Sequence, residues 1–210
     1  MTADPARGGV TVESDTDPWL VVGLGNPGPG YAGTRHNVGH LVADLLAQRI
    51  SASWRRHRTG RADTAEGRVG TPGAGAAPRL VLLKGRGYMN ESGGPVAAVA
   101  NYLSVDVDRI IVVHDELDLD FNILRVKRGG GDNGHNGLRS LRRSLGSGNF
   151  ARVRVGIGRP PGRQDPADYV LSAWSSVQRS DLDLLVGRAA DAVEDLTLRG
   201  LVVTQNEYNS

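Results

Sequence analysis

The chain has 210 residues, a length suited to one domain with a sizeable core, and its net charge at pH 7 is only +2. It contains no cysteine, which excludes a disulfide framework and thiolate chemistry and is consistent with a cytoplasmic protein. No apolar run reaches the roughly 18 residues of a membrane span, so we expect no membrane association.

The first half of the chain alternates between strand and helix patterns. A short apolar run predicts a buried strand at 19–22, and apolar residues at helical spacing predict a helix over 38–50. Residues 62–69 carry a weak strand pattern, and 71–78 are rich in Gly, Ala and Pro, which is typical of a loop. A clear strand is predicted at 79–84.

The alternation continues in the second half. Pro95 suits the first turn of a helix that runs to residue 103. Residues 109–113 are continuous and β-branched, as expected for a central strand that is covered on both faces. Further strands are predicted at 122–126 and 152–157, with a helix at 138–145 between them.

A long amphipathic helix is predicted at 176–198, with Gly200 ending it. The alternation of strands and helices predicts an α/β fold with three layers, in which helices flank a mixed, mostly parallel central sheet. Residues 1–18 are polar and lack the apolar centre of a signal peptide. We therefore expect a disordered lead at 1–18 and a single domain at 19–210.

Residues 23–28 match the G-x-G-x-x-G fingerprint of dinucleotide-binding proteins, but their context does not. That fingerprint needs its last glycine at the opening of a helix, where the pyrophosphate binds. Here Pro27 and Pro29 flank Gly28, and the helical pattern begins only near residue 37. The acidic residue at the required spacing, Asp44, falls inside that helix, so we reject a dinucleotide site.

The modest net charge hides a strongly basic segment at residues 125–163. It holds ten basic residues against the single acid Asp132, a net charge of +9. The basic residues are Arg125, Lys127, Arg128, Arg139, Arg142, Arg143, Arg152, Arg154, Arg159 and Arg163. Such clustering indicates a phosphate-rich partner, although a solvated basic face would give the same pattern.

Polar side chains gather in four loops, at residues 26–37, 88–90, 114–118 and 135–136. The first three loops follow predicted strands, so they should share the carboxyl edge of the sheet, where open α/β sheets bind ligands. Three of the five histidines lie in these loops, and they are His36, His114 and His135. The sequence therefore predicts an active or binding site at this edge.

A histidine and a carboxylate from separate loops can act together as a general base. His36 has three candidate partners, which are Asp115, Glu116 and Asp118. Without cysteine, and without a G-x-S-x-G turn, the nucleophile is predicted to be water. The amides of Asn26, Asn90 and Asn136 could donate to a developing oxyanion or to a peptide-like ligand.

Each of these residues also has a purely structural interpretation. Asn26 can be a turn residue, His114 a packed side chain behind an apolar strand, and Asp115 a helix or turn cap. The histidines and acids do not form an H-E-x-x-H motif or another clustered ligand spacing. We therefore predict no metal.

Several motifs, in order from about Trp19 to the C-terminus, closely resemble bacterial peptidyl-tRNA hydrolases. They are Gly23-Leu24-Gly25-Asn26-Pro27-Gly28, Tyr31, Thr34-Arg35-His36-Asn37-Val38-Gly39, Tyr88-Met89-Asn90 with Ser92-Gly93, His114-Asp115-Glu116-Leu117-Asp118, Gly129-Gly130-Gly131 with Gly134-His135-Asn136-Gly137-Leu138, and Arg154-Val155-Gly156-Ile157-Gly158. Any one motif is weak evidence. Their joint order and spacing make the resemblance specific.

The resemblance implies a cytosolic, monomeric α/β enzyme that hydrolyses the ester between a peptide and the 3′ end of tRNA, without metal or cofactor. It implies that His36 activates water, that Asp115 orients His36, and that Asn26 recognises an N-blocked aminoacyl group. It also implies a groove for the peptide and the terminal adenosine, lined by Tyr31, Tyr88, Met89, Asn90, His135 and Asn136.

The resemblance further implies that Arg125, Lys127 and Arg154 contact tRNA phosphates. Three residues depart from the family pattern: Glu91 replaces an apolar residue, and the pair Asp132-Asn133 makes the glycine loop more acidic. A non-catalytic RNA-binding protein on the same scaffold is the main alternative. Because such a protein needs neither His36 nor Asp115, the presence of both favours the enzyme.

Overall fold

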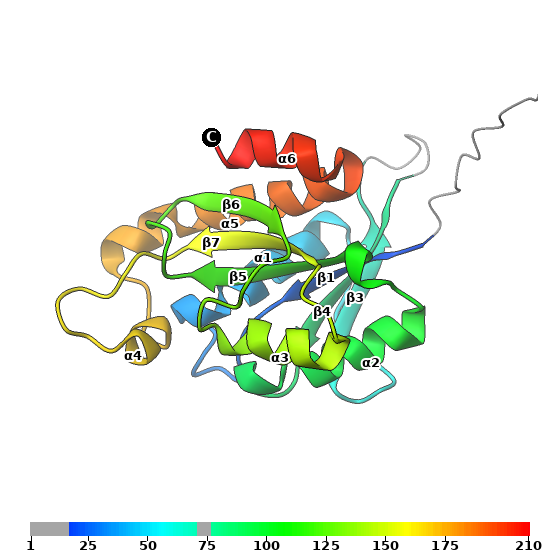
Figure 1. The fold of residues 1–210 in the computed structure, drawn as a ribbon, viewed down its shortest axis with the longest axis horizontal. Helices are drawn as coiled ribbons and strands as arrows, with labels where there is room; N and C mark the ends of the chain where they lie inside the picture. Colours follow the sequence, from blue (N-terminus) through cyan, green and yellow to red (C-terminus); the bar gives the residue numbers. More distant parts are fainter. Residues whose placement is uncertain (1–16, 71–76) are drawn as a thin grey trace, which may run out of the picture.

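The computed structural model describes residues 17–70 and 77–210 (Figure 1). The disordered lead predicted at 1–18 lies outside the described residues except for its last two positions. The loop predicted at 71–78 likewise lies outside them except for its last two positions. None of the helices in the described ranges is both long and apolar enough to cross a bilayer.

In the described part of the chain, the strands form one mixed sheet of seven strands in the order β2-β3-β4-β1-β5-β7-β6. The strands are β1 Trp19–Gly23, β2 Arg55–Arg56, β3 Ala62–Arg68, β4 Arg79–Gly85, β5 Ile110–Glu116, β6 Leu124–Arg128 and β7 Ala151–Gly156. The central strands β4, β1, β5 and β7 run parallel to one another. The outer strands β2, β3 and β6 pair antiparallel, which confirms the predicted mixed sheet.

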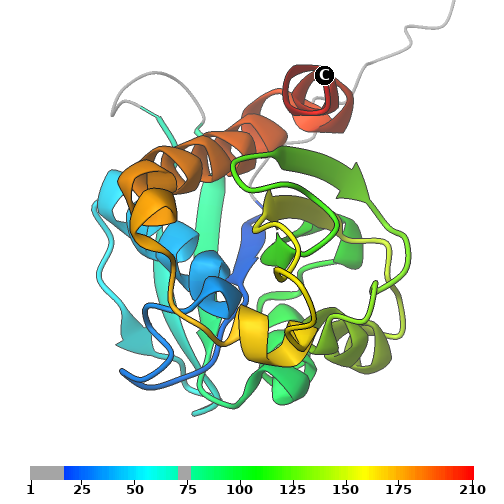
Figure 2. The same ribbon diagram turned by 90° about the vertical axis from the view of Figure 1, so that its left-hand side faces the viewer.

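Helices cover both faces of this sheet and make the predicted three layers (Figures 1 and 2). The α-helices are α1 Val38–Arg49, α2 Gly93–Leu103, α3 Asn136–Leu145, α4 Pro166–Val170, α5 Ser176–Leu198 and α6 Gly200–Tyr208. Short 3₁₀ turns occur at η1 Arg35–Asn37, η2 Met89–Glu91 and η3 Val107–Arg109. Helices α1 and α5 pack on one face and α2 and α3 on the other, while α6 lies against β6.

The apolar runs of the sequence explain why the central strands are buried on both sides. Along β1, Val21 packs in the core under α1 and α5, whereas Leu20 and Val22 pack in the core under α2 and α3. In β5, Ile110 and Ile111 face opposite cores in the same way. A strand with apolar side chains on both faces can only lie in the interior of a layered fold.

Several element boundaries differ from the predictions for local reasons. Strand β5 continues through His114, Asp115 and Glu116, which were expected to be loop residues, because β7 pairs with them. The strand predicted at 122–126 is found two residues later, since Asn122 has a left-handed backbone with φ of 70°.

Two helices were not predicted. Helix α4 spans only five residues, too few for a periodic pattern to reveal it. Helix α6 follows α5 directly, because Gly200, with φ of 78°, turns the chain between them. The predicted end of α5 at Gly200 is correct, but a second helix starts at the same glycine.

The close approach of α2 and α3 provides a test of this packing. A Cβ atom at Gly93 would lie 2.1 Å from the backbone oxygen of Ser140, whereas a Cβ at Gly94 would meet only the tip of Arg61 at 3.9 Å. We expect Gly93→Ala to lower the free energy of unfolding by about 2 kcal/mol or more through overpacking. Gly94→Ala should stay within about 1 kcal/mol of the parent or be slightly more stable. Urea unfolding measures both, and equal effects of the two substitutions would contradict this packing.

Candidate active site

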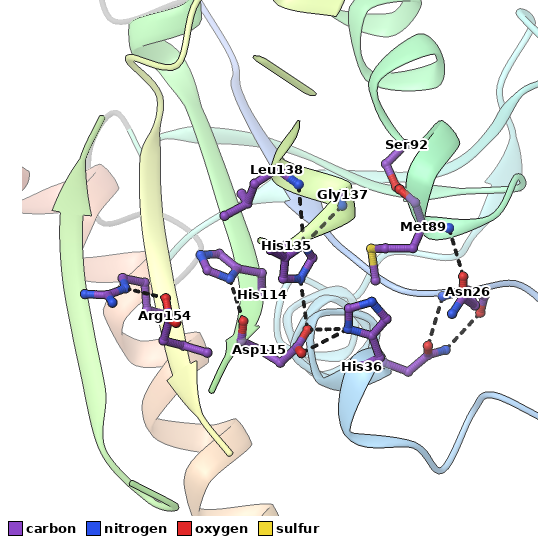
Figure 3. Close-up of polar contacts among 12 residues, drawn as sticks. Asn26, His36, Met89, Ser92, His114, Asp115, His135, Gly137, Leu138 and Arg154 are labelled. Atoms are coloured by element: carbon purple, nitrogen blue, oxygen red, sulfur yellow. Dashed lines mark hydrogen bonds and ion pairs between the residues drawn. The ribbon is translucent and has the colours of Figure 1, made fainter. Parts of the chain in front are cut away.

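The parallel strands β1, β4 and β5 end at the same edge of the sheet, as predicted, and their ends and the segments that follow them contribute to the lining of a cavity of about 880 Å³. Eight of the predicted site residues line it, and they are Asn26, His36, Tyr88, Met89, Asn90, Asp115, His135 and Asn136. Four segments that are distant in the sequence thus meet at one site (Figure 3).

Asn26 is held in place by a second asparagine. Its backbone N–H donates to Oδ1 of Asn37, and Nδ2 of Asn37 donates back to the Asn26 carbonyl, both at 2.9 Å. The side-chain Oδ1 of Asn26 accepts from the backbone N–H of Met89 at 2.8 Å. Its Nδ2 group makes no hydrogen bond within the described ranges, so this donor remains available at the cavity.

His36 and Asp115 form the predicted pair. Nδ1 of His36 lies 2.9 Å from both carboxylate oxygens of Asp115, and both residues are buried. A carboxylate at Nδ1 fixes the tautomer with the proton on Nδ1 and leaves the lone pair on Nε2. The side chain of His36 can therefore accept a proton at Nε2.

Asp115 also binds a second imidazole, that of His135. Nε2 of His135 lies 3.0 Å from Oδ1 of Asp115. The other ring nitrogen, Nδ1, accepts from the backbone N–H groups of Gly137 at 3.1 Å and Leu138 at 3.4 Å, at the start of α3. Because Nδ1 is an acceptor, the proton of the neutral ring resides on Nε2. The Nε2–H group therefore donates a hydrogen bond to Asp115. His135 lines the cavity as expected, but its polar contacts are to Asp115 and α3.

These contacts determine the charge of Asp115. Burial alone would raise the pKa of this carboxyl, but the charges and hydrogen bonds of His36 and His135 lower it well below its usual range. Asp115 therefore stays ionised at neutral pH and can stabilise a positive charge on His36.

His36, Asp115 and His135 together have the composition of a metal site, with their ligand atoms within 4.8 Å of one another. The tautomer of His135 disfavours that interpretation. A metal at its Nε2 would force the proton onto Nδ1, which faces the N–H groups of Gly137 and Leu138. The arrangement is better suited to sharing protons than to holding a cation.

His114 is a poor candidate for the base although it neighbours Asp115. Its Nδ1 donates to the backbone oxygen of Asp115 at 2.7 Å, and its Nε2 has no partner in the described part of the molecule. Burial, and then the nearby His135, lower the pKa of His114 well below its ordinary value. The ring stays neutral and packs edge-on against that of His135.

The expected aromatic residues occupy the rim. Tyr88 lines the cavity and is 56% exposed. Tyr31 lies outside the lining, on a turn that its backbone closes with Gly28 and Thr34, and its ring meets that of Tyr88 edge-on at 6.3 Å. Glu91 supports this rim, because its carboxylate accepts from the backbone N–H of Tyr88 at 3.3 Å.

The predicted phosphate-binding residues Arg125, Lys127 and Arg154 lie side by side on β6 and β7, outside the cavity lining. Arg154 donates from Nε to the buried Glu116 at 2.9 Å. Arg125 donates to the backbone oxygens of Tyr208 and Ser210. Burial, and then the neighbouring arginines 154 and 152, lower the pKa of Lys127.

Arg152 is counted in the basic segment at 125–163, but it is buried and adds nothing to a basic surface. The residue is 1% exposed, and its guanidinium donates to the carbonyl oxygens of Gly131 at 2.5 Å and Gly130 at 2.8 Å. It therefore holds the glycine loop that precedes His135. The role of Asn37 was not predicted, because the only signal for it in the sequence is its position beside His36.

The fold and this site define an α/β protein with a buried histidine–carboxylate pair at the carboxyl edge of its sheet. A sequence model of the peptidyl-tRNA hydrolase family matches residues 20–210. The chain belongs to the peptidyl-tRNA hydrolase family, whose members are hydrolases, and the resemblance seen in its motifs is confirmed.

Two relatives and one solved structure illustrate this membership. The chain is 58% identical to the peptidyl-tRNA hydrolase of Kineococcus radiotolerans over 93% of this chain and 98% of the relative. It is 57% identical to that of Streptomyces coelicolor, over 92% and 96% of the two chains. The crystal structure of the Acinetobacter baumannii peptidyl-tRNA hydrolase superposes with a TM-score of 0.81 at 32% identity, covering 92% of this chain and 95% of that one.

His40 provides a test of the packing behind the site. Its ring lies against Gly25 and near Asn37, and burial, followed by the charge of Lys84, lowers the pKa of His40 to about 4. The unfolded chain binds this proton near pH 6.5, so the folded state loses stability as the pH falls from 6.5 towards 4. We expect His40→Gln to remove about 3 kcal/mol of that loss, as measured by urea unfolding at pH 7 and pH 4. An unchanged pH dependence would show that His40 is protonated readily in the folded state.

Proposed function

We propose that this chain hydrolyses the ester bond of peptidyl-tRNA by means of a water molecule activated by His36 and Asp115. The observation that carries the proposal is the cavity in which His36 contacts an ionised Asp115. The family to which the chain belongs, and the names of its relatives, supply the substrate.

The proposed reaction needs no covalent intermediate. Nε2 of His36 takes a proton from water as the water oxygen bonds to the ester carbonyl carbon. The Nδ2 group of Asn26 is suited to donate to a carbonyl oxygen of the acyl group. The tetrahedral intermediate then breaks its bond to the ribose oxygen, which receives the proton from His36. Asp115 stabilises the imidazolium between these two transfers.

His135 has a supporting role in this proposal. Its locked tautomer makes it a permanent donor to Asp115, so this carboxylate is oriented from two sides. An ester is more easily cleaved than an amide, and we propose that one oriented base is sufficient.

The remaining predicted residues suit recognition. We propose that Tyr31, Tyr88, Met89, Asn90 and Asn136 bind the peptide and the terminal adenosine, which agrees with the exposed aromatic rim. Lys127 and Arg154, with Arg125 beside them, are proposed to contact tRNA phosphates outside the cavity. Such contacts tolerate many sequences, as an enzyme acting on many tRNAs requires.

We further propose that the enzyme acts as a monomer in the cytoplasm, where ribosomes make its substrate. We also propose that residues 19–210 form a single catalytic domain. The competing function, RNA binding without catalysis, requires neither the ionised Asp115 nor its contact with His36.

The activity is tested with N-acetyl-aminoacyl-tRNA and with unblocked aminoacyl-tRNA. We expect cleavage of the blocked substrate, and a loss of roughly 10²–10⁴-fold in His36→Ala, the range for removal of a general base. Binding of tRNA should be nearly unchanged in this variant. Intact tRNA binding by the parent protein without ester cleavage would favour the non-catalytic RNA-binding protein.

The phosphate surface is tested through the salt dependence of tRNA binding. We expect Lys127→Ala to reduce the slope of log affinity against log salt concentration by about one. Lys127 is preferable to Arg154, because removal of Arg154 would leave Glu116 buried without its partner. Arg79→Ala is the control and should leave the slope unchanged, because Arg79 is the first residue of β4 and lies at the end of the parallel strands away from the cavity. A slope that Lys127→Ala does not alter would remove Lys127 from the tRNA surface.

A further inference from the structure

One wall of the active-site cavity comes from a segment that is remote from the other site residues in the sequence. Residues 165–171, which include α4, contribute Asp165, Pro166, Ala167, Val170 and Leu171 to the lining. Most of these side chains are apolar, unlike those around His36. We call this segment the α4 wall. Figure 2 shows α4 beside the start of α1, where the catalytic turn η1 lies.

Arg35, the residue before His36, joins the end of this wall to the catalytic turn. Its Nη1 donates to the backbone oxygen of Ser172 at 3.2 Å, to Oγ of Ser172 at 2.6 Å and to the backbone oxygen of Ala173 at 2.7 Å. Its Nη2 donates to Oε1 of Gln178 at 2.7 Å. Both arms of the guanidinium are therefore bonded to the segment that follows α4.

The environment of Arg35 is unusual for a buried cation. Arg35 is only 6% exposed, and it takes part in no ion pair in the described part of the chain. Instead, its Cζ atom lies 4.3 Å from the ring centre of Tyr169 and 5.6 Å from that of Trp174. Carbonyl oxygens and aromatic faces thus replace a carboxylate, and the planar guanidinium meets both at once.

The backbone reinforces the same junction. The N–H of Arg35 donates to the carbonyl of Ser172 at 3.2 Å, and Thr34 forms a β-bridge with Ala173. Tyr169 is fixed further by its hydroxyl, which donates to the carbonyl of Ile157 at 2.8 Å. Any shift of the α4 wall must therefore disturb the turn that carries His36.

We propose that Arg35 is a positioning residue that fixes the α4 wall at a set distance from His36, and that this wall receives the acyl side of the substrate. The proposal rests on the proposed esterase function. In this proposal, specificity for the peptide depends on the junction between Arg35 and the segment that follows α4. This junction contacts neither the reacting atoms nor the tRNA. The wall is mainly apolar near Val170 and Leu171, so its contacts should matter more for a long apolar peptide than for a small acyl group.

The test compares Arg35→Lys with the parent on two substrates, N-acetyl-glycyl-tRNA and an N-acetylated apolar tetrapeptidyl-tRNA. Lysine keeps the charge but cannot bond both sides of the fork. We expect KM for the tetrapeptidyl substrate to rise about tenfold, the scale of altered apolar contacts in a pocket, and KM for the glycyl substrate to change by less than about threefold. Hydrogen exchange of residues 169–173 should become faster in the same variant.

Arg188→Lys is the matched control. Arg188 also donates to a backbone carbonyl, that of Asn122 at 3.0 Å, but it joins α5 to a loop outside the cavity lining. This variant should leave both KM values and the exchange of 169–173 unchanged. A purely structural role of Arg35 would reduce the active fraction and lower kcat equally for both substrates.

Equal effects of Arg35→Lys on both substrates, or none, would overturn the assigned specificity. Unchanged exchange at 169–173 would overturn the junction itself. If the parent protein cleaves neither substrate, the proposed function fails and the acyl specificity fails with it. The exchange comparison then still decides whether Arg35 holds the wall, because it does not depend on activity.

Discussion

The buried carboxylate of Asp115 is the group on which the rest of the site depends. It accepts hydrogen bonds from His36 and His135, and without them a buried charge would be strongly unfavourable. In return it fixes the tautomer of His36. His135 can make its contact only because the N-terminus of α3 supplies N–H groups to its other nitrogen. The site is thus a chain of donors and acceptors that runs from a helix end to the proposed base.

The fold brings these side chains together because its parallel strands end at the same edge of the sheet. Strand β1 leads to Asn26 and His36, β4 leads to Met89, and β5 carries Asp115 in its last residues. Apolar packing on both faces of the sheet fixes the strands, and hydrogen bonds between the loops fix the side chains. The pair of Asn26 with Asn37, and the bond from Met89 to Asn26, show how one loop orients the next. Such support restricts the reacting groups to one geometry.

The basic segment shows how composition and structure differ. Its charge of +9 is spread over residues with separate roles. Arg152 is buried beneath the glycine loop, Arg154 neutralises Glu116, and Arg125 binds backbone oxygens near residue 210. Of the three residues proposed to contact phosphates, Lys127 is the one that makes no hydrogen bond to an acid or a carbonyl among the described residues. The count of charges therefore overstates the surface that can meet phosphates.

The sequence by itself determined the family, the α/β class and most of the strands and helices, because apolar periodicity and loop motifs are local properties of the chain. It also indicated His36 and Asp115, since each lies in a polar stretch that follows a predicted strand. Only the tertiary structure decided that His135 donates to Asp115, that Asn37 holds Asn26, and that Arg35 binds the segment after α4. These contacts join residues between 11 and 138 positions apart. No local pattern records such pairs, because their partners are chosen by the packing of the whole chain.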